Sequence, residues 1–179
     1  MSDTSTPTST PTSTSTGLRP ALTAASAGSH FHFLNHLATI KSDRHRTASG
    51  MNAVEFTAPR GFGPPLHLHR EEDEIMYVVS GEIRLRIDGD DQVATDGAVV
   101  SLPAGVPHTF QVVSERATFL TVAGGRRHEP SFDEFVAAMG RQTPSPDQPA
   151  PTDIDPGHVA EIAGTHGIEI IGPPPAALD

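Results

Sequence analysis

Short apolar runs separated by turn residues make up most of the sequence after residue 30. Between residues 82 and 87, Ile83, Leu85 and Ile87 alternate with charged side chains, which is typical of a β-strand with one solvated face. Turn signals recur about every 8–12 residues, and this spacing predicts a β-sandwich or β-barrel. The predicted strands cover residues 30–40 (one long strand or a pair), 51–57, 67–69, 74–79, 82–88, 92–95, 98–102, 106–113 and 117–122. A turn at residues 80–81 is expected to join two of these strands as a hairpin.

A short helix is predicted after the last of these strands. Ser131 and Glu134 have the spacing of a capping box, and Gly140 marks the end of the helix. Its apolar residues share one face, which is expected to pack on the barrel: Phe132, Phe135, Val136 and Met139. A Pro-rich stretch follows, and after it the pattern predicts a second helix at residues 158–166 and a short strand at 167–171.

The chain is expected to form one domain with an extension at each end. Residues 1–29 are predicted to be a disordered tail and its lead-in, because residues 1–16 consist mainly of Thr, Ser and Pro, with no apolar residue after Met1. Residues 30–140 are predicted to be the barrel and its helix. Residues 141–179 are predicted to be a Pro-rich linker, followed by a helix and strand that pack on the barrel.

Composition excludes several classes of function. The formal net charge is −10 and the basic residues form no long cluster, so nucleic-acid binding is not expected. No run approaches the ~18 apolar residues of a membrane-spanning helix, and the N-terminus lacks the features of a secretory signal, so we expect a cytoplasmic protein. Because the chain has no cysteine, any metal site must use histidine and carboxylate ligands.

One stretch, from Gly61 to Glu82, carries the main candidate chemistry. In an extended segment residues i and i+2 share a face, so His67 and His69 point the same way. Glu74 opens the next extended run, and a turn between the two segments would bring its carboxylate to the imidazoles. Two nitrogens and one oxygen on one face are typical of a divalent transition-metal site with open positions.

A second stretch, from Gly97 to Phe110, supplies a third imidazole. A turn at residues 103–105 precedes a predicted strand, and His108 lies near the start of that strand. The two stretches together predict a site with three histidines and one glutamate.

These stretches resemble the two halves of the signature of the cupin family. The first half matches at Gly61, His67, His69, Glu74 and Gly81, with every spacing kept. The second half matches at Gly97, Pro103, Gly105 and His108. Its final Asn position is Val112 here, a departure that affects no metal ligand. Residues from about 33 to 140, and the tail around 167–174, further resemble the single-domain bacterial cupins called quercetin 2,3-dioxygenase-like.

The resemblance implies an all-β fold, a cupin-type jelly-roll barrel with short C-terminal helical segments and a metal inside. It implies one divalent transition-metal ion (Fe, Mn, Co, Ni, Cu or Zn), held by four ligands: His67, His69, Glu74 and His108. It also implies a homodimer. Asp73 is an alternative carboxylate ligand, but only Glu74 keeps the family spacing to Gly81 and begins the apolar run.

The other charged residues and histidines near these motifs are not expected to bind the metal. Glu71 and Glu72 are expected to lie in a solvated turn. A second His-x-His, His30 and His32, and the nearby His36 lack a carboxylate partner and a Gly/Pro frame. We expect these three to be exposed or edge-strand histidines; the rim of the pocket and a further metal site are the alternatives.

The residues around the metal are predicted from the alternation of side chains along the strands. Met76 and Val78 share a face with Glu74, Phe110 shares one with His108, and Phe56 is a further candidate. The pocket is therefore expected to be apolar with one metal-bearing point. Such a pocket suits a small aromatic or enol substrate that chelates through oxygen.

The resemblance favours an enzyme, a metal-dependent dioxygenase that uses a small chelating substrate and dioxygen. In this hypothesis Glu74 is the general base that takes a proton from the substrate hydroxyl. Two alternatives stay open. One is a redox-neutral enzyme (isomerase, cyclase, dehydratase or hydrolase), and the other is a non-catalytic protein that binds a metal or a small molecule.

Overall fold

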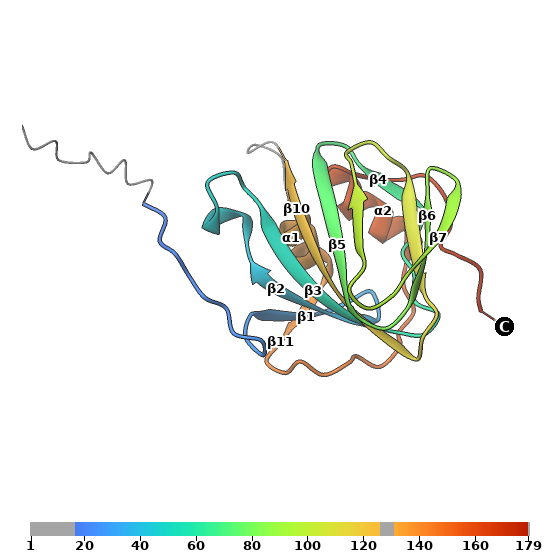
Figure 1. Cartoon of the computed structure of the whole chain (residues 1–179), viewed down its shortest axis with the longest axis horizontal. Helices are drawn as coiled ribbons and strands as arrows, with labels where there is room; N and C mark the ends of the chain where they lie inside the picture. Colours follow the sequence, from blue (N-terminus) through green and yellow to red (C-terminus); the bar gives the residue numbers. More distant parts are fainter. Residues whose placement is uncertain (1–16, 126–130, 179) are drawn as a thin grey trace, which may run out of the picture.

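A computed structural model describes residues 17–125 and 131–178. Its body consists of two antiparallel sheets (Figure 1). The first sheet contains, in spatial order, β11 (Arg141–Thr143), β1 (Ser29–Phe33), β2 (His36–Ser42), β3 (Asn52–Pro59), β10 (Arg116–Gly125), β5 (Glu72–Ser80) and β8 (Val99–Leu102). The second contains β12 (Ile168–Ile170), β4 (His67–His69), β9 (His108–Val112), β6 (Ile83–Ile87) and β7 (Asp90–Ala94). This is the jelly-roll architecture that we predicted; the predicted disordered tail at residues 1–16 lies outside the described residues.

Two helices follow the last long strand. They are α1 (Phe132–Met139) and α2 (Pro156–Thr165), and a 3₁₀ turn at Arg44–Arg46 follows β2. The predicted capping box of α1 is present, since the backbone N–H of Ser131 donates to Glu134 Oε2 at 2.9 Å. Gly140 ends the helix as predicted, but its φ is −85°. A Cβ there would lie 2.9 Å from Cβ of Phe31, so close packing, and not a left-handed conformation, requires glycine.

The predicted hairpin at Ser80-Gly81 is wrong. β5 belongs to the first sheet and β6 to the second, where β6 pairs with β7 and β9. The turn therefore carries the chain from one sheet to the other. Gly81 has a φ of +95°, and a Cβ there would lie 2.5 Å from the carbonyl oxygen of Arg116, so the turn tolerates only glycine.

The C-terminal region contributes to both sheets. The predicted linker begins with a strand that the sequence analysis missed, because β11 pairs with β1 at the edge of the first sheet. The predicted C-terminal strand is present as β12, and it pairs with β4. In this pairing Ile168 lies opposite His69 and Ile170 lies opposite His67, so the end of the chain supports the strand that carries two of the candidate ligands.

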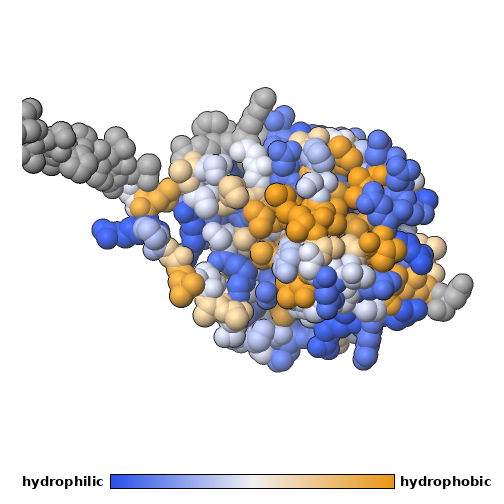
Figure 2. Space-filling model, in the orientation of Figure 1, coloured by the Kyte–Doolittle hydropathy of each residue, from blue (hydrophilic) through white to orange (hydrophobic). Residues whose placement is uncertain are grey.

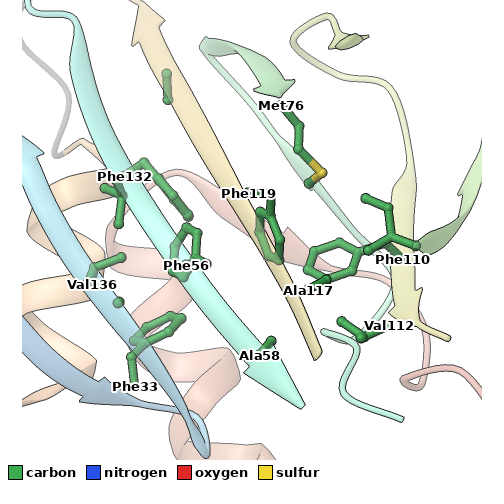
Figure 3. Close-up of a cluster of buried hydrophobic side chains, with 14 of the residues drawn as sticks. Phe33, Phe56, Ala58, Met76, Phe110, Val112, Ala117, Phe119, Phe132 and Val136 are labelled. Carbon is green, nitrogen blue, oxygen red and sulfur yellow. The ribbon is translucent and has the colours of Figure 1, made fainter. Parts of the chain in front are cut away.

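Phenylalanine side chains form the centre of the core, although aromatic residues make up only 5% of the chain (Figure 3). Phe119 on β10 lies between Phe56 and Phe110, with ring centroids 5.4 and 5.1 Å away. Phe132 extends this group toward α1, at 5.9 Å from Phe56. These rings fill the space between the sheets and form much of the wall of the cavity that holds the site.

The outer face of the first sheet carries an exposed apolar stripe. Ile75, Tyr77 and Val79 on β5 are 43–47% exposed, and Val99 on β8 is 63% exposed. Tyr77 and Val99 are directly paired across the two strands. Figure 2 shows hydrophobic residues gathered on the face where Figure 1 shows β5 and β10. None of the described helices has the length and apolar character needed to cross a membrane.

Candidate metal centre and cavity

The fold brings together three histidines that are separated by up to 41 residues in the sequence. His67 and His69 lie on β4, and His108 lies at the start of β9, directly paired with His67. One nitrogen from each imidazole falls within 4.8 Å of the others. Ligands that are each about 2.1 Å from one ion are at most about 4.2 Å apart, so these nitrogens need to move only a few tenths of an ångström to share a metal.

Backbone carbonyls fix the tautomers of two of these rings. His67 Nδ1 lies 2.8 Å from the carbonyl oxygen of Pro65, and His108 Nδ1 lies 2.9 Å from that of Val106. Because a carbonyl oxygen only accepts hydrogen bonds, each Nδ1 carries the proton and each Nε2 keeps its lone pair. Burial is the main cause that lowers the pKa of His67, to about 3, and also lowers the pKa values of His69 and His108. All three rings are therefore neutral donors, the form that binds metals.

Glu74 supplies the fourth group. Its Oε2 atom lies 3.4 Å from Nε2 of His69 and 3.8 Å from Nε2 of His108. The hydroxyl of Thr121 donates to the other carboxylate oxygen, Oε1, at 3.4 Å. Burial raises the pKa of Glu74 to about 7 despite this hydrogen bond, because the charged form loses its hydration. Burial therefore makes this carboxyl a better proton acceptor than an exposed glutamate.

Three buried nitrogens of this cluster make no hydrogen bond to the described residues, although the carboxylate of Glu74 is near two of them. Nδ1 and Nε2 of His69 and Nε2 of His108 are buried without a hydrogen bond to any described residue. Leaving such polar atoms unpaired costs free energy, and a metal ion would satisfy them. Neutral imidazoles beside a carboxylate suit a divalent transition metal. The residues present therefore fit the ion that the sequence analysis expected.

Asp73, the alternative carboxylate ligand, lies elsewhere. It points to the exposed side of β5, and its Oδ1 atom accepts a hydrogen bond from the backbone N–H of Ala104 at 2.9 Å. The alternation of β5 explains the difference, because Glu74 and Asp73 necessarily face opposite sides of the sheet.

The prediction that Glu72 lies in a solvated turn is wrong. Glu72 is the first residue of β5 and is only 7% exposed. Its Oε2 atom lies 4.0 Å from Nδ1 of His69, and Asn52 donates to its Oε1 atom at 3.5 Å. Burial raises the pKa of Glu72 to about 7. The signal was available, since Glu72 is two residues before Glu74 and therefore shares its face.

The prediction that His30, His32 and His36 are exposed or on an edge strand is wrong. His30 and His32 lie outside the metal cluster, but they are half-buried and β1 is flanked by β11 and β2. His32 Nε2 contacts the carbonyl oxygen of Asp147 at 3.1 Å. His36 is neither exposed nor on an edge strand: it is 2% exposed and lies on β2, between β1 and β3. It lines the same cavity as the cluster.

An apolar cavity of about 70 Å³ adjoins the cluster. His67, Glu74 and His108 form its polar wall, together with Thr121 and His36. Most of the other lining residues are apolar and come from both sheets and both helices, among them Phe56, Met76, Phe110, Phe132, Val159 and Ile168. Three of the four pocket residues that we predicted therefore lie on its wall. The fourth, Val78, is fully buried in the core and is not among the lining residues.

The contact between β12 and β4 leads to a stability prediction. Ile168 is 2% exposed, lines the cavity and lies opposite His69. We expect Ile168→Ala to lower the free energy of unfolding by about 2–5 kcal/mol, and to weaken metal binding because β4 loses support. Ile171→Ala is the matched control: this side chain is 43% exposed, and its loss should change stability by no more than about 0.5 kcal/mol. Urea unfolding and chelator competition measure both effects, and equal values for the two variants would contradict the role of β12.

The architecture and the site define a class: a double-sheet β-protein with a three-histidine, one-glutamate cluster facing an apolar cavity. Comparison with known proteins agrees with this description. The family model described as "Cupin domain" matches residues 54–123. Quercetin 2,3-dioxygenase of Bacillus subtilis (strain 168) is 27% identical over 111 residues, which are 61% of this chain and 33% of the relative. The match thus spans about a third of that relative's length.

Solved structures also align with part of the chain. KdgF from Halomonas sp. is 21% identical, with a TM-score of 0.47, covering 52% of this chain and 82% of that one. An RmlC-like cupin from Shewanella frigidimarina is 21% identical, with a TM-score of 0.46, covering 53% of this chain and 80% of that one. The family model thus matches the central part of the chain, residues 54–123, and the two antiparallel sheets agree with that match. The likeness to quercetin 2,3-dioxygenase is distant.

Proposed function

We propose that this protein is a metal-dependent dioxygenase that acts on a small chelating aromatic or enol substrate. The observation that carries the proposal is the cluster of His67, His69, His108 and Glu74 beside an apolar cavity, which His67, Glu74 and His108 line. Four protein ligands leave coordination positions open on a metal that accepts six, as catalytic sites require. The distant likeness to quercetin 2,3-dioxygenase supports a substrate with a hydroxyl beside a carbonyl.

The residues of the chain have distinct roles in this proposal. His67, His69 and His108 would hold the metal through their Nε2 atoms. When bound, the metal would supply a Lewis acid that lowers the pKa of a substrate hydroxyl. Glu74 would loosen from the metal and accept the proton of that hydroxyl as general base. The phenylalanines exclude water from the ionised substrate, which then reacts with dioxygen.

The size of the cavity limits the substrate. Its volume of about 70 Å³ is well below the ~300–1,000 Å³ of typical small-molecule sites. A three-ring flavonol such as quercetin is much larger than this cavity, so a smaller substrate matches it better. We therefore propose a substrate with a single ring or an acyclic enol.

A redox-neutral enzyme is the second candidate. The observation that favours it is the buried Glu74, whose pKa of about 7 suits proton transfer in both directions. An isomerase or cyclase would use the same metal and the same base without consuming dioxygen.

Oxygen uptake distinguishes the two candidates. Protein loaded separately with Fe²⁺, Mn²⁺, Co²⁺, Ni²⁺ and Cu²⁺ is mixed with catechol, kojic acid and quercetin in an oxygen electrode. The dioxygenase proposal expects oxygen consumption with at least one small chelator, and none from His67→Ala/His69→Ala. Conversion of a chelator without oxygen would instead support the redox-neutral candidate, and tight binding with no conversion would support a binding protein.

The homodimer stays a prediction. The exposed apolar stripe of Ile75, Tyr77, Val79 and Val99 supports it, because this surface would lose contact with water against a second copy.

A further inference from the structure

A fourth imidazole lines the cavity apart from the metal cluster. His36 is the first residue of β2, and its ring is packed against Phe62, Phe33 and Phe56, with centroid distances of 4.0, 5.2 and 5.3 Å. Among the described residues, no ring contact joins His36 to the three cluster histidines; it is connected to His69 only through successive ring contacts with Phe56 and Phe132. His36 is therefore a separate polar point in an otherwise apolar part of the wall.

The hydrogen bonding of His36 determines what it offers to a ligand. Its Nδ1 atom lies 3.2 Å from the carbonyl oxygen of Leu34, so Nδ1 carries the proton and donates. Burial lowers the pKa of His36 to about 3, which keeps the ring neutral. Nε2 is consequently a pure acceptor, and it has no hydrogen-bond partner within residues 17–125 and 131–178. His67 and His108 use the same bond, to the carbonyl two residues earlier, to present their own Nε2 atoms.

The turn that positions His36 is strained. Leu34 and Asn35 connect β1 to β2 with φ values of +47° and +67°. A two-residue hairpin turn of this kind needs positive φ at both positions, but a bulky leucine is rarely found there. The Asn35 side chain holds the turn: its Nδ2 donates to the carbonyl oxygen of Thr152 at 2.8 Å, and its Oδ1 accepts from the Thr152 N–H at 2.9 Å. Strain that the surroundings maintain is common at functional sites, and Leu34 itself lines the cavity.

We propose that Nε2 of His36 accepts a hydrogen bond from a hydroxyl or N–H group of the ligand, and that it selects ligands with a donor at a distance from their chelating oxygens. The proposal rests on the proposed function, because it takes the ligand to be one that chelates the metal. It adds a specificity requirement: the substrate must chelate at one end and donate at another. An apolar ring without that donor leaves Nε2 unpaired in the complex and binds less tightly.

Two hydroxypyranones test this requirement directly. Kojic acid and allomaltol share the same chelating hydroxyl and ketone on one ring, and they differ only in a hydroxyl on the substituent across the ring. Binding of each is measured by calorimetry to protein loaded with Zn²⁺, which does no redox chemistry, so the result does not depend on dioxygenase activity. We expect kojic acid to bind about 3- to 10-fold more tightly, the range for one net hydrogen bond.

His36→Phe should remove this preference, so that kojic acid and allomaltol bind about equally. Phenylalanine keeps a ring among the aromatic neighbours of residue 36 but has no hydrogen-bond acceptor. His32→Phe is the matched control, since His32 lies outside the cavity lining, and it should keep the preference. Equal affinities in the parent protein, or a preference that persists in His36→Phe, would overturn the role of His36 alone. Binding of neither probe would count against the chelating ligand and thus against both proposals.

Nitrogen-15 NMR of the parent protein gives a second readout that does not require a variant. Long-range spectra of the imidazole nitrogens should show His36 Nε2 as unprotonated in the free protein. Its resonance should shift on addition of kojic acid and shift less on addition of allomaltol. A protonated Nε2, or identical shifts with both probes, would contradict the proposal.

Discussion

Glu74→Gln is expected to lower turnover by about 10²- to 10⁴-fold, the usual contribution of a general base. Glutamine has nearly the shape of glutamate and still accepts a hydrogen bond from Thr121, so the fold should persist. Its amide cannot take a proton from the substrate hydroxyl. The measurement is steady-state oxygen uptake with the most active chelator, alongside metal content, so that loss of the ion is separated from loss of the base.

Glu72→Gln is the matched control for this variant. Glu72 is two residues away on the same face of β5, is similarly buried, and also has a pKa raised to about 7. It has no contact with His108 of the kind that Glu74 makes. We expect it to change turnover by less than about tenfold, below the range for a general base. Wild-type turnover in metal-loaded Glu74→Gln would eliminate the base role, and equal losses in both variants would point to a general effect of carboxylates on the site.

Acidification below pH 6.5 is expected to destabilise the metal-free protein steeply. Burial lowers the pKa values of His36, His67, His69 and His108, so between pH 6.5 and about 4 the unfolded chain takes up protons that the folded chain does not. Each such proton lowers stability by ~1.4 kcal/mol per pH unit as the pH falls. Glu72 and Glu74 act in the opposite direction, since their raised pKa values favour the protonated folded state below pH 7 and cost stability as the pH rises.

Three histidines with strongly lowered pKa values and two glutamates with raised ones leave a net uptake of about one proton on unfolding between pH 6 and pH 5, and His108 adds up to one more. The expected loss of stability is therefore ~1.4–3 kcal/mol per pH unit. Urea unfolding at fixed pH values measures it. His36→Phe should reduce this slope by about one proton, whereas Glu74→Gln should make it steeper by about one. A stability that is flat across this range, or one that rises on acidification, would show that the histidines are not buried in the neutral form.

The candidate metal ligands were predictable because their spacing contains most of the required geometry. His67 and His69 share a face in any extended segment, and the turns before His108 and after His69 place the remaining groups at the same end of the sheets. The period of two also placed Met76 and Phe110 on the cavity wall. In these cases a local rule determined which side chains point inward.

The missed features depend on pairing between distant segments. The local sequence at Ser80-Gly81 is typical of a hairpin. However, β6 pairs with β9 in one sheet, while β5 pairs with β10 and with β8 in the other. His36 is buried because β1 and β3 flank its strand and Phe62 covers its ring, contacts that no local pattern reveals. Glu72 is a different case, since its face was predictable, and the charged run around it was mistaken for a solvated turn.

Metal content tests the central claim most directly. The protein is purified without added metal and without a nickel column, and its metals are measured by elemental analysis beside two double variants. His67→Ala/His69→Ala removes two proposed ligands, and His30→Ala/His32→Ala removes the other His-x-His pair, which lies on β1. We predict about one transition-metal ion per chain in the parent and in His30→Ala/His32→Ala, and none in His67→Ala/His69→Ala. Equal content in all three proteins, or no metal in the parent after reloading with each of Fe, Mn, Co, Ni, Cu and Zn, would contradict the metal centre and the dioxygenase proposal with it.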